Sequence, residues 1–133
     1  MYTLTDYSVR KTIYKFYVNP AIKLRQRKRM ELNQYLNEVK QFALPTALNR
    51  EYLSLGLAGE VGEVVSLIAK AVRDNEGVVN PEKLAKELGD VQWFVVMLCA
   101  YYGIKPNDIL TSNVEKLASR QARGVIGGSG DER

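Results

Sequence analysis

The sequence predicts an all-α fold, a four-helix bundle, and three observations support this. Apolar residues recur at intervals of three and four positions, which is the spacing of one face of a helix. No run of alternating apolar and polar residues has the length of a strand. Helix-capping residues separate the periodic segments. With 133 residues, the chain is long enough for one domain with a real core.

Each predicted helix has its own start and stop. In the first, the apolar positions are Leu32, Tyr35, Leu36, Val39 and Phe42, which recur at helical spacing, and Pro45 interrupts the pattern. Asn49 is a candidate N-cap for the second, and Asn80 followed by proline for the third, which Gly103 ends. The four predicted helices are residues 31–42, 50–72, 81–102 and 106–122. The glycine-rich tail, residues 123–133, is predicted to lie outside regular helix.

Charge divides the chain into two parts. Residues 1–29 hold eight Lys or Arg and one acid, a balance of +7, whereas residues 30–133 hold eleven Lys or Arg and fourteen acids, a balance of −3. We therefore predict a basic N-terminal extension over residues 1–29, expected to be poorly ordered, and a domain over residues 30–133. Three further interpretations of the extension stay open: a nucleic-acid or anionic-surface arm, a targeting segment, or sequence upstream of a true start at Met30.

Composition excludes several kinds of chemistry. The chain contains no histidine, which excludes Ser-His-Asp and Cys-His catalysis and zinc sites with imidazole ligands. Its one cysteine, Cys99, lies in an apolar run, so we expect a buried core residue and a cytoplasmic, reducing setting. No apolar run has the roughly 20 residues of a membrane span.

Two pairs of acids are the strongest feature of the sequence. Glu60 and Glu63 are three residues apart in the second predicted helix, as are Glu87 and Asp90 in the third. Each pair lies on one helix face among apolar residues, and antiparallel helices would bring the pairs together. Four clustered carboxylates repel one another unless a cation lies between them, and oxygen ligands favour Mg²⁺, Mn²⁺ or Ca²⁺ over softer transition metals. The alternative is interhelical salt bridges to lysine or arginine, for which Lys70, Arg73 and Lys86 are available.

Glycines and aromatic residues accompany the acids. Gly56, Gly59 and Gly62 lower helix propensity, which implies the close approach of another backbone or a ligand. Trp93 and Phe94 follow Asp90; such aromatics are more often core, but one near a metal could stack on a nucleobase.

The fourth predicted helix carries a polar, largely basic face. Its members, spaced 3, 4 and 3 residues apart, are Asn113, Lys116, Arg120 and Arg123. Alone, such a face is usually solvated. Beside a carboxylate-bound divalent ion it would neutralise phosphates, and the glycine-rich tail could add backbone N–H donors or be a frayed end.

Four segments carry a family resemblance. Residues 55–64 (LGLAGEVGEV), 86–91 (KELGDV), 113–117 (NVEKL) and 123–131 (RGVIGGSGD) resemble the MazG-type, all-α nucleoside triphosphate pyrophosphohydrolases. The resemblance covers about residues 31–133 and implies Mg²⁺-dependent hydrolysis of a (d)NTP to the (d)NMP and pyrophosphate, in pool house-cleaning or control. It does not extend to the basic extension.

The resemblance also implies roles for individual residues. It makes Glu60, Glu63, Glu87 and Asp90 metal ligands, with one acid doubling as the base for the attacking water. Asn113 and Lys116 match phosphate-contacting positions, and Arg120 and Arg123 extend that set by spacing. It further implies a homodimer or homotetramer with a shared pocket. The alternatives are a bundle that binds nucleotide and metal without turnover, and a nucleic-acid-binding module acting through the extension, which we regard as the weaker interpretation.

Overall fold

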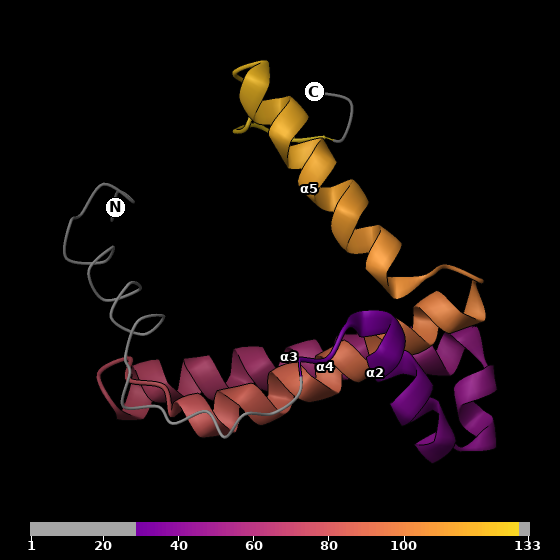
Figure 1. Ribbon diagram of the computed structural model, residues 1–133. Coiled ribbons are helices and arrows are strands. Elements are labelled where there is room, and N and C mark those ends of the chain that lie inside the picture. Colours follow the sequence, from indigo (N-terminus) through magenta and orange to yellow (C-terminus); the bar gives the residue numbers. More distant parts are fainter. Residues whose placement is uncertain (1–28, 131–133) are drawn as a thin grey trace.

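The computed structural model describes residues 29–130, in which every regular element is a helix (Figure 1). Nearly all of the predicted basic extension therefore lies outside the described residues. Between residues 29 and 130 no strand occurs, which confirms the all-α prediction. The elements are α2 (Leu32–Val39), the 3-10 helices η1 (Lys40–Phe42) and η2 (Pro45–Leu48), α3 (Arg50–Asp74), α4 (Pro81–Tyr101) and α5 (Pro106–Ala122).

The helix starts follow the predicted caps. The side-chain oxygen of Asn49 accepts a hydrogen bond from the Tyr52 amide at 2.9 Å. The side-chain oxygen of Asn80 accepts from the amides of Glu82 and Lys83 at 2.9 and 3.2 Å. These bonds satisfy amides that have no partner within the first helical turn, so α3 and α4 begin where the sequence predicts.

Two helices end at glycines in the left-handed region. Gly103 has φ +68°, and the amide of Ile104 donates to the Cys99 carbonyl at 2.8 Å. Gly124 has φ +70°, and the amide of Val125 donates to the Arg120 carbonyl at 2.9 Å. Both are Schellman ends, which glycine adopts without steric cost. The predicted role of Gly103 as a helix end is confirmed.

The helices α3 and α4 form a long antiparallel hairpin, joined by a short turn over residues 75–80 (Figure 1). Helix α2 packs against α4 and against the start of α5. Helix α5 projects away from the hairpin instead of lying along it (Figure 1). The polar face of α5 and the paired acids of the hairpin are therefore carried by different arms of the chain.

A small core fills the junction of α2, η2, α3 and α4. Its fully packed members are Ala47, Leu53, Phe94 and Met97, with Leu36 and Trp93 among the partly buried residues against them. Cys99 is also buried, and this desolvation raises the pKa of its thiol, which agrees with the predicted core role.

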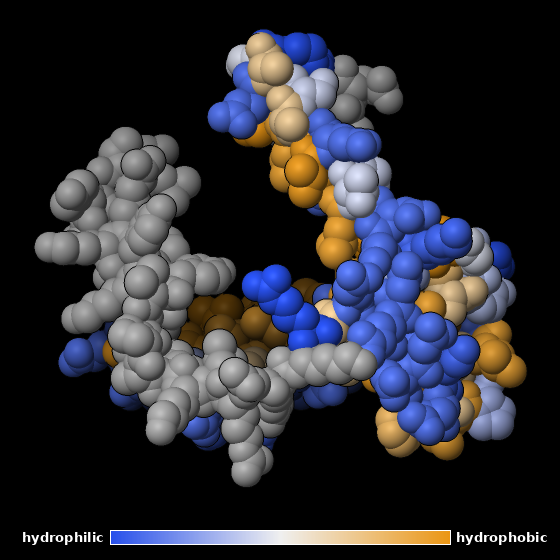
Figure 2. Space-filling model, in the orientation of Figure 1, coloured by the Kyte–Doolittle hydropathy of each residue, from blue (hydrophilic) through white to orange (hydrophobic). Residues whose placement is uncertain are grey.

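Much apolar surface stays uncovered on both arms. On α3, exposed Val61, Val65, Ile68 and Val72 recur at helical spacing, and we call them the α3 stripe. On α5, exposed Leu110, Val114 and Leu117 do the same, and we call them the α5 stripe. Figure 2 shows apolar surface along α5, beside the hollow between α5 and the hairpin. No described helix is long and apolar enough to span a membrane.

Candidate metal centre

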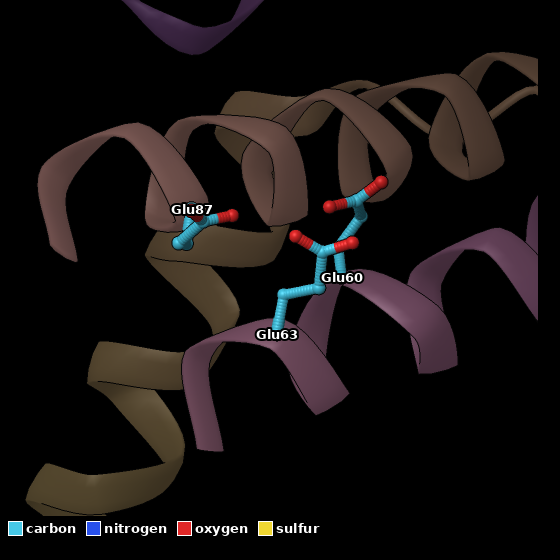
Figure 3. A group of neighbouring side chains, drawn as sticks. All are labelled: Glu60, Glu63 and Glu87. Atoms are coloured by element: carbon cyan, nitrogen blue, oxygen red, sulfur yellow. The ribbon is translucent and has the colours of Figure 1, made fainter. Parts of the chain in front are cut away.

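Three carboxylates converge in the gap between α3 and α4. Glu60, Glu63 and Glu87 each offer a carboxylate oxygen, and these oxygens all lie within 4.8 Å of one another. Figure 3 shows Glu60 and Glu63 reaching up from α3 and Glu87 reaching across from α4. Two local features produce this arrangement: the i, i+3 spacing within α3, and the antiparallel packing that places Glu87 opposite.

The charges of this cluster act on one another. Partial burial raises the pKa of the Glu60 carboxyl above its ordinary value of 4.5. Like charge raises it further, from Glu63, Asp90 and Glu87 in that order. A bound cation would remove this repulsion. The donor set, consisting of carboxylate oxygens alone, fits a hard divalent ion such as Mg²⁺ or Mn²⁺.

Salt bridges do not neutralise the cluster within residues 29–130. The two ion pairs there join sequence neighbours, Arg50 with Glu51 at 2.7 Å and Arg73 with Asp74 at 2.6 Å. Both pairs are exposed, and neither contains a member of the cluster. The alternative of interhelical salt bridges to Lys70, Arg73 or Lys86 is therefore wrong for the described part of the chain.

Asp90 lies at the edge of the site. It is one turn after Glu87 on α4 and is exposed, and it is not among the three carboxylates that meet within 4.8 Å. Its charge still contributes to the raised pKa of Glu60, so it borders the cluster. The structure thus brings three of the four predicted ligands together and places the fourth beside them.

The predicted phosphate-binding residues lie elsewhere. Asn113, Lys116, Arg120 and Arg123 all belong to α5 or its end, on the arm that projects from the hairpin (Figure 1). Arg120 is only 5% exposed, and its Nη2 donates to the Gly130 carbonyl at 3.1 Å. The glycine-rich tail therefore folds back onto Arg120, so it is not a frayed end over residues 124–130. One copy of the chain does not bring these residues to the acids.

The two aromatic candidates have different positions. Phe94 is 8% exposed and belongs to the core, where its ring packs edge-on against Trp93 at a centroid distance of 4.9 Å. Trp93 is partly buried and lies at the border of that core. We therefore place Phe94 in the core, and only Trp93 retains a position from which it could reach a ligand.

One residue near the acids was not singled out by the sequence pattern. Tyr35, on α2, was predicted only as part of an apolar helix face. Partial burial raises the pKa of its phenol above the ordinary value of 10.0, and the negative charge of Asp90 raises it further. Tyr35 therefore lies close to Asp90. The only sequence signal was a hydroxyl among positions that are otherwise wholly apolar.

Comparisons with known proteins identify a family for this chain. The family model of the MazG nucleotide pyrophosphohydrolase domain matches residues 48–125, which include all four acids and the whole of α3, α4 and α5. The chain is also similar to the Gene 37 protein of Mycobacterium phage L5, with 42% identity over 85 residues. That match covers 62% of this chain and 75% of the phage protein. No solved structure matches the chain significantly.

Proposed function

This chain belongs to the MazG nucleotide pyrophosphohydrolase family, and on that basis we propose that it hydrolyses nucleoside triphosphates to the monophosphate and pyrophosphate. One observation carries the proposal. Three carboxylates converge between α3 and α4, and no described ion pair neutralises them. Such a site suits a divalent ion that also contacts phosphate oxygens. Nucleotide-pool house-cleaning or control is the role that this reaction would serve.

The chain's own residues have defined parts in this reaction. Glu60, Glu63 and Glu87 would hold the ion, with Asp90 at its border. When bound, the ion polarises the α-phosphoryl group and lowers the pKa of a water molecule. The chain has no histidine, so one of the acids accepts the proton of the attacking water. The water oxygen bonds to the α-phosphorus, the bond to the bridging oxygen breaks, and pyrophosphate leaves.

A second copy of the chain would complete the site. Helix α5, which carries the polar face, projects away from the hairpin that carries the acids (Figure 1), yet pyrophosphate needs cationic partners as it leaves. The α3 and α5 stripes leave apolar side chains uncovered on both arms; Val65 and Val114, for example, are 58% and 67% exposed. Surfaces of this kind favour association. We therefore include a homodimer or homotetramer in the proposal, in which Asn113, Lys116 and Arg123 of one copy serve the acids of another.

The test is turnover of a panel of the common NTPs and dNTPs with and without Mg²⁺, with chromatographic separation of the products. We expect monophosphate and pyrophosphate in the presence of Mg²⁺, and a loss of more than about 100-fold in Glu63→Gln. Glu38→Gln, which changes an exposed acid on α2, is the matched control and should retain full activity. Diphosphate with inorganic phosphate would show that a different bond is cut. Nucleotide binding without turnover would favour a non-catalytic binding protein.

A further inference from the structure

The acidic cluster has two chemically different sides along the α3–α4 hairpin. Because α3 and α4 are antiparallel and Gly56 faces Phe94, the next turn of α3, at Glu60, faces the preceding turn of α4, at Asp90. Beyond Glu63, toward the turn at residues 75–80, the partly buried side chains are aliphatic apart from one serine: Val64, Ser66, Leu67, Ala71 and Leu84. Beyond Asp90 lie the aromatic residues Trp93 and Tyr35.

Packing places Tyr35 on the Asp90 side. Its neighbour Leu36 packs against the core cluster that contains Phe94. Phe94 is four residues after Asp90 on α4, so the two lie on the same face one turn apart. Tyr35 is itself partly buried, and it is close enough to Asp90 to feel its charge. The phenol therefore borders the acids from a third helix.

Helix α2 is fastened in this position. The Asn33 amide donates to the side-chain oxygen of Asn107 at 3.1 Å, and the Asn107 amide donates to the side-chain oxygen of Asn33 at 3.0 Å. The side-chain amide of Asn107 also donates to Glu31 at 3.1 Å. This reciprocal pair joins α2 to the start of α5, so Tyr35 is held beside the site before any ligand arrives.

We propose that Tyr35 is a nucleoside-positioning residue, which contacts the sugar or base of a nucleotide whose phosphates lie at the acids. This inference rests on the proposed function. A nucleotide with its phosphates at Glu60, Glu63 and Glu87 can extend its nucleoside either toward the aliphatic side or toward the aromatic side. A base stacks on aromatic rings, and a sugar or base edge needs a hydrogen-bonding group, which the phenol supplies. The side toward the turn offers no aromatic ring, and its one partly buried hydroxyl belongs to Ser66.

The test separates contact with the nucleoside from contact with the phosphates. Tyr35→Leu and Tyr35→Phe are compared with wild type for KM and kcat on the best nucleotide, and for inhibition by inorganic tripolyphosphate, which has no nucleoside. Tyr101→Phe is the control, because Tyr101 is exposed at the far end of α4. We expect Tyr35→Leu to raise KM by roughly fivefold or more, as for one lost aromatic contact with a base, with kcat within about twofold. Inhibition by tripolyphosphate should not change.

The other possible outcomes of this test distinguish the role of Tyr35 from the proposed function itself. Tyr35→Phe keeps the ring and its packing, so a rise in KM of about threefold would confirm the role even if Tyr35→Leu folds poorly. Equal weakening of tripolyphosphate and nucleotide, or a fall in kcat at constant KM, would show that Tyr35 acts on the acids and would overturn the inference. If wild type hydrolyses nothing, the proposed function fails, and equilibrium binding of nucleotide and tripolyphosphate decides the role of Tyr35. Absence of nucleotide binding by wild type would overturn both.

Discussion

Gly56 on α3 lies directly against the ring of Phe94 on α4. A Cβ atom added at Gly56 would overlap the side-chain atoms of Phe94, whereas Gly59 and Gly62 have nothing within 4 Å of the corresponding position. One glycine of the three therefore lets the hairpin close over an aromatic ring, one turn from the acids. The close approach predicted from these glycines involves a side chain, not another backbone, and it applies within this chain to Gly56 alone.

Substitution of Gly56 should therefore destabilise the fold. We expect Gly56→Ala to lower the free energy of unfolding by about 1–3 kcal/mol, because overpacking outweighs the gain of about 1 kcal/mol in helix propensity. Urea unfolding at fixed protein concentration measures this change. Gly59→Ala is the matched control and should be neutral or stabilising. A Gly56→Ala variant as stable as Gly59→Ala would contradict the packing argument.

The local features of this fold were predictable because each depends on a few neighbouring residues. Asn49, Asn80 and Gly103 cap helices through bonds that span at most five residues. The convergence of Glu60, Glu63 and Glu87 also followed from sequence, because i, i+3 pairs on consecutive antiparallel helices have few other arrangements.

The features that could not be predicted from the sequence depend on contacts between distant segments. The position of Tyr35 beside Asp90 is set by how α2 crosses α4, and the direction of α5 is set by its junction with α2. The burial of Arg120 depends on the return path of the tail, which no periodicity describes. Helical spacing placed Arg120 on one face with Lys116, but it carried no information about what covers that face.

In metal-free protein, the contribution of Glu60 to stability should fall as pH rises. The pKa of Glu60 is raised in the folded state, so its neutral form is favoured there and the folded state binds more protons than the unfolded one. This contribution is fully present below the ordinary pKa of 4.5 and is lost as pH rises through the higher folded value. Thermal melts with a chelator should therefore show Glu60→Gln gaining stability relative to wild type as pH rises from about 4 to 7.

Divalent metal should reverse the stability difference between Glu60→Gln and wild type at pH 7. Binding at 100 times the dissociation constant stabilises a folded protein by about 2.7 kcal/mol, and Glu60→Gln should lose most of that gain. The readout is the shift in Tm on adding Mg²⁺ or Mn²⁺ at pH 7, with Glu38→Gln as the control. Equal shifts in wild type and Glu60→Gln would show that the ion binds elsewhere.

The contact between Arg120 and the glycine-rich tail should protect the C-terminal segment from proteolysis. Arg120 is buried and donates to the Gly130 carbonyl, whereas Arg123 is exposed. Loss of a hydrogen bond from a buried charged donor costs about 1–3 kcal/mol, so Arg120→Gln should release the tail. Thermolysin should then cut before Val125 or Ile126 faster in Arg120→Gln than in wild type or Arg123→Gln, as followed by mass spectrometry. Equal rates in both variants would mean that this bond does not hold the tail.

The exposed stripes should mediate self-association. A charge placed in an apolar contact is left without a partner, so Val65→Glu on α3 and Val114→Glu on α5 should each shift the protein toward smaller species. Sedimentation velocity over a range of concentrations measures this shift. Gln121→Glu, at an exposed polar position of α5, is the control and should associate as wild type does. Unchanged association in both stripe variants would place the interface elsewhere.

A shared site makes a stronger prediction than association alone. If α5 of one copy serves the acids of another, Glu63→Gln and Lys116→Gln should each be nearly inactive alone, yet regain activity when mixed. In a mixed dimer, one site carries both substitutions and the other carries neither. With equal amounts and free exchange, half of the dimers are mixed and half of their sites are intact, which restores about a quarter of wild-type activity.

The mixture is assayed after incubation that permits subunit exchange, and a mixture of Glu63→Gln and Glu87→Gln is the control. Both control substitutions lie on the hairpin, so each site in a mixed dimer lacks either Glu63 or Glu87. No activity should therefore return. No recovery in the test pair would show that α5 acts within its own chain, whereas recovery in the control would show that one site combines acids from two copies.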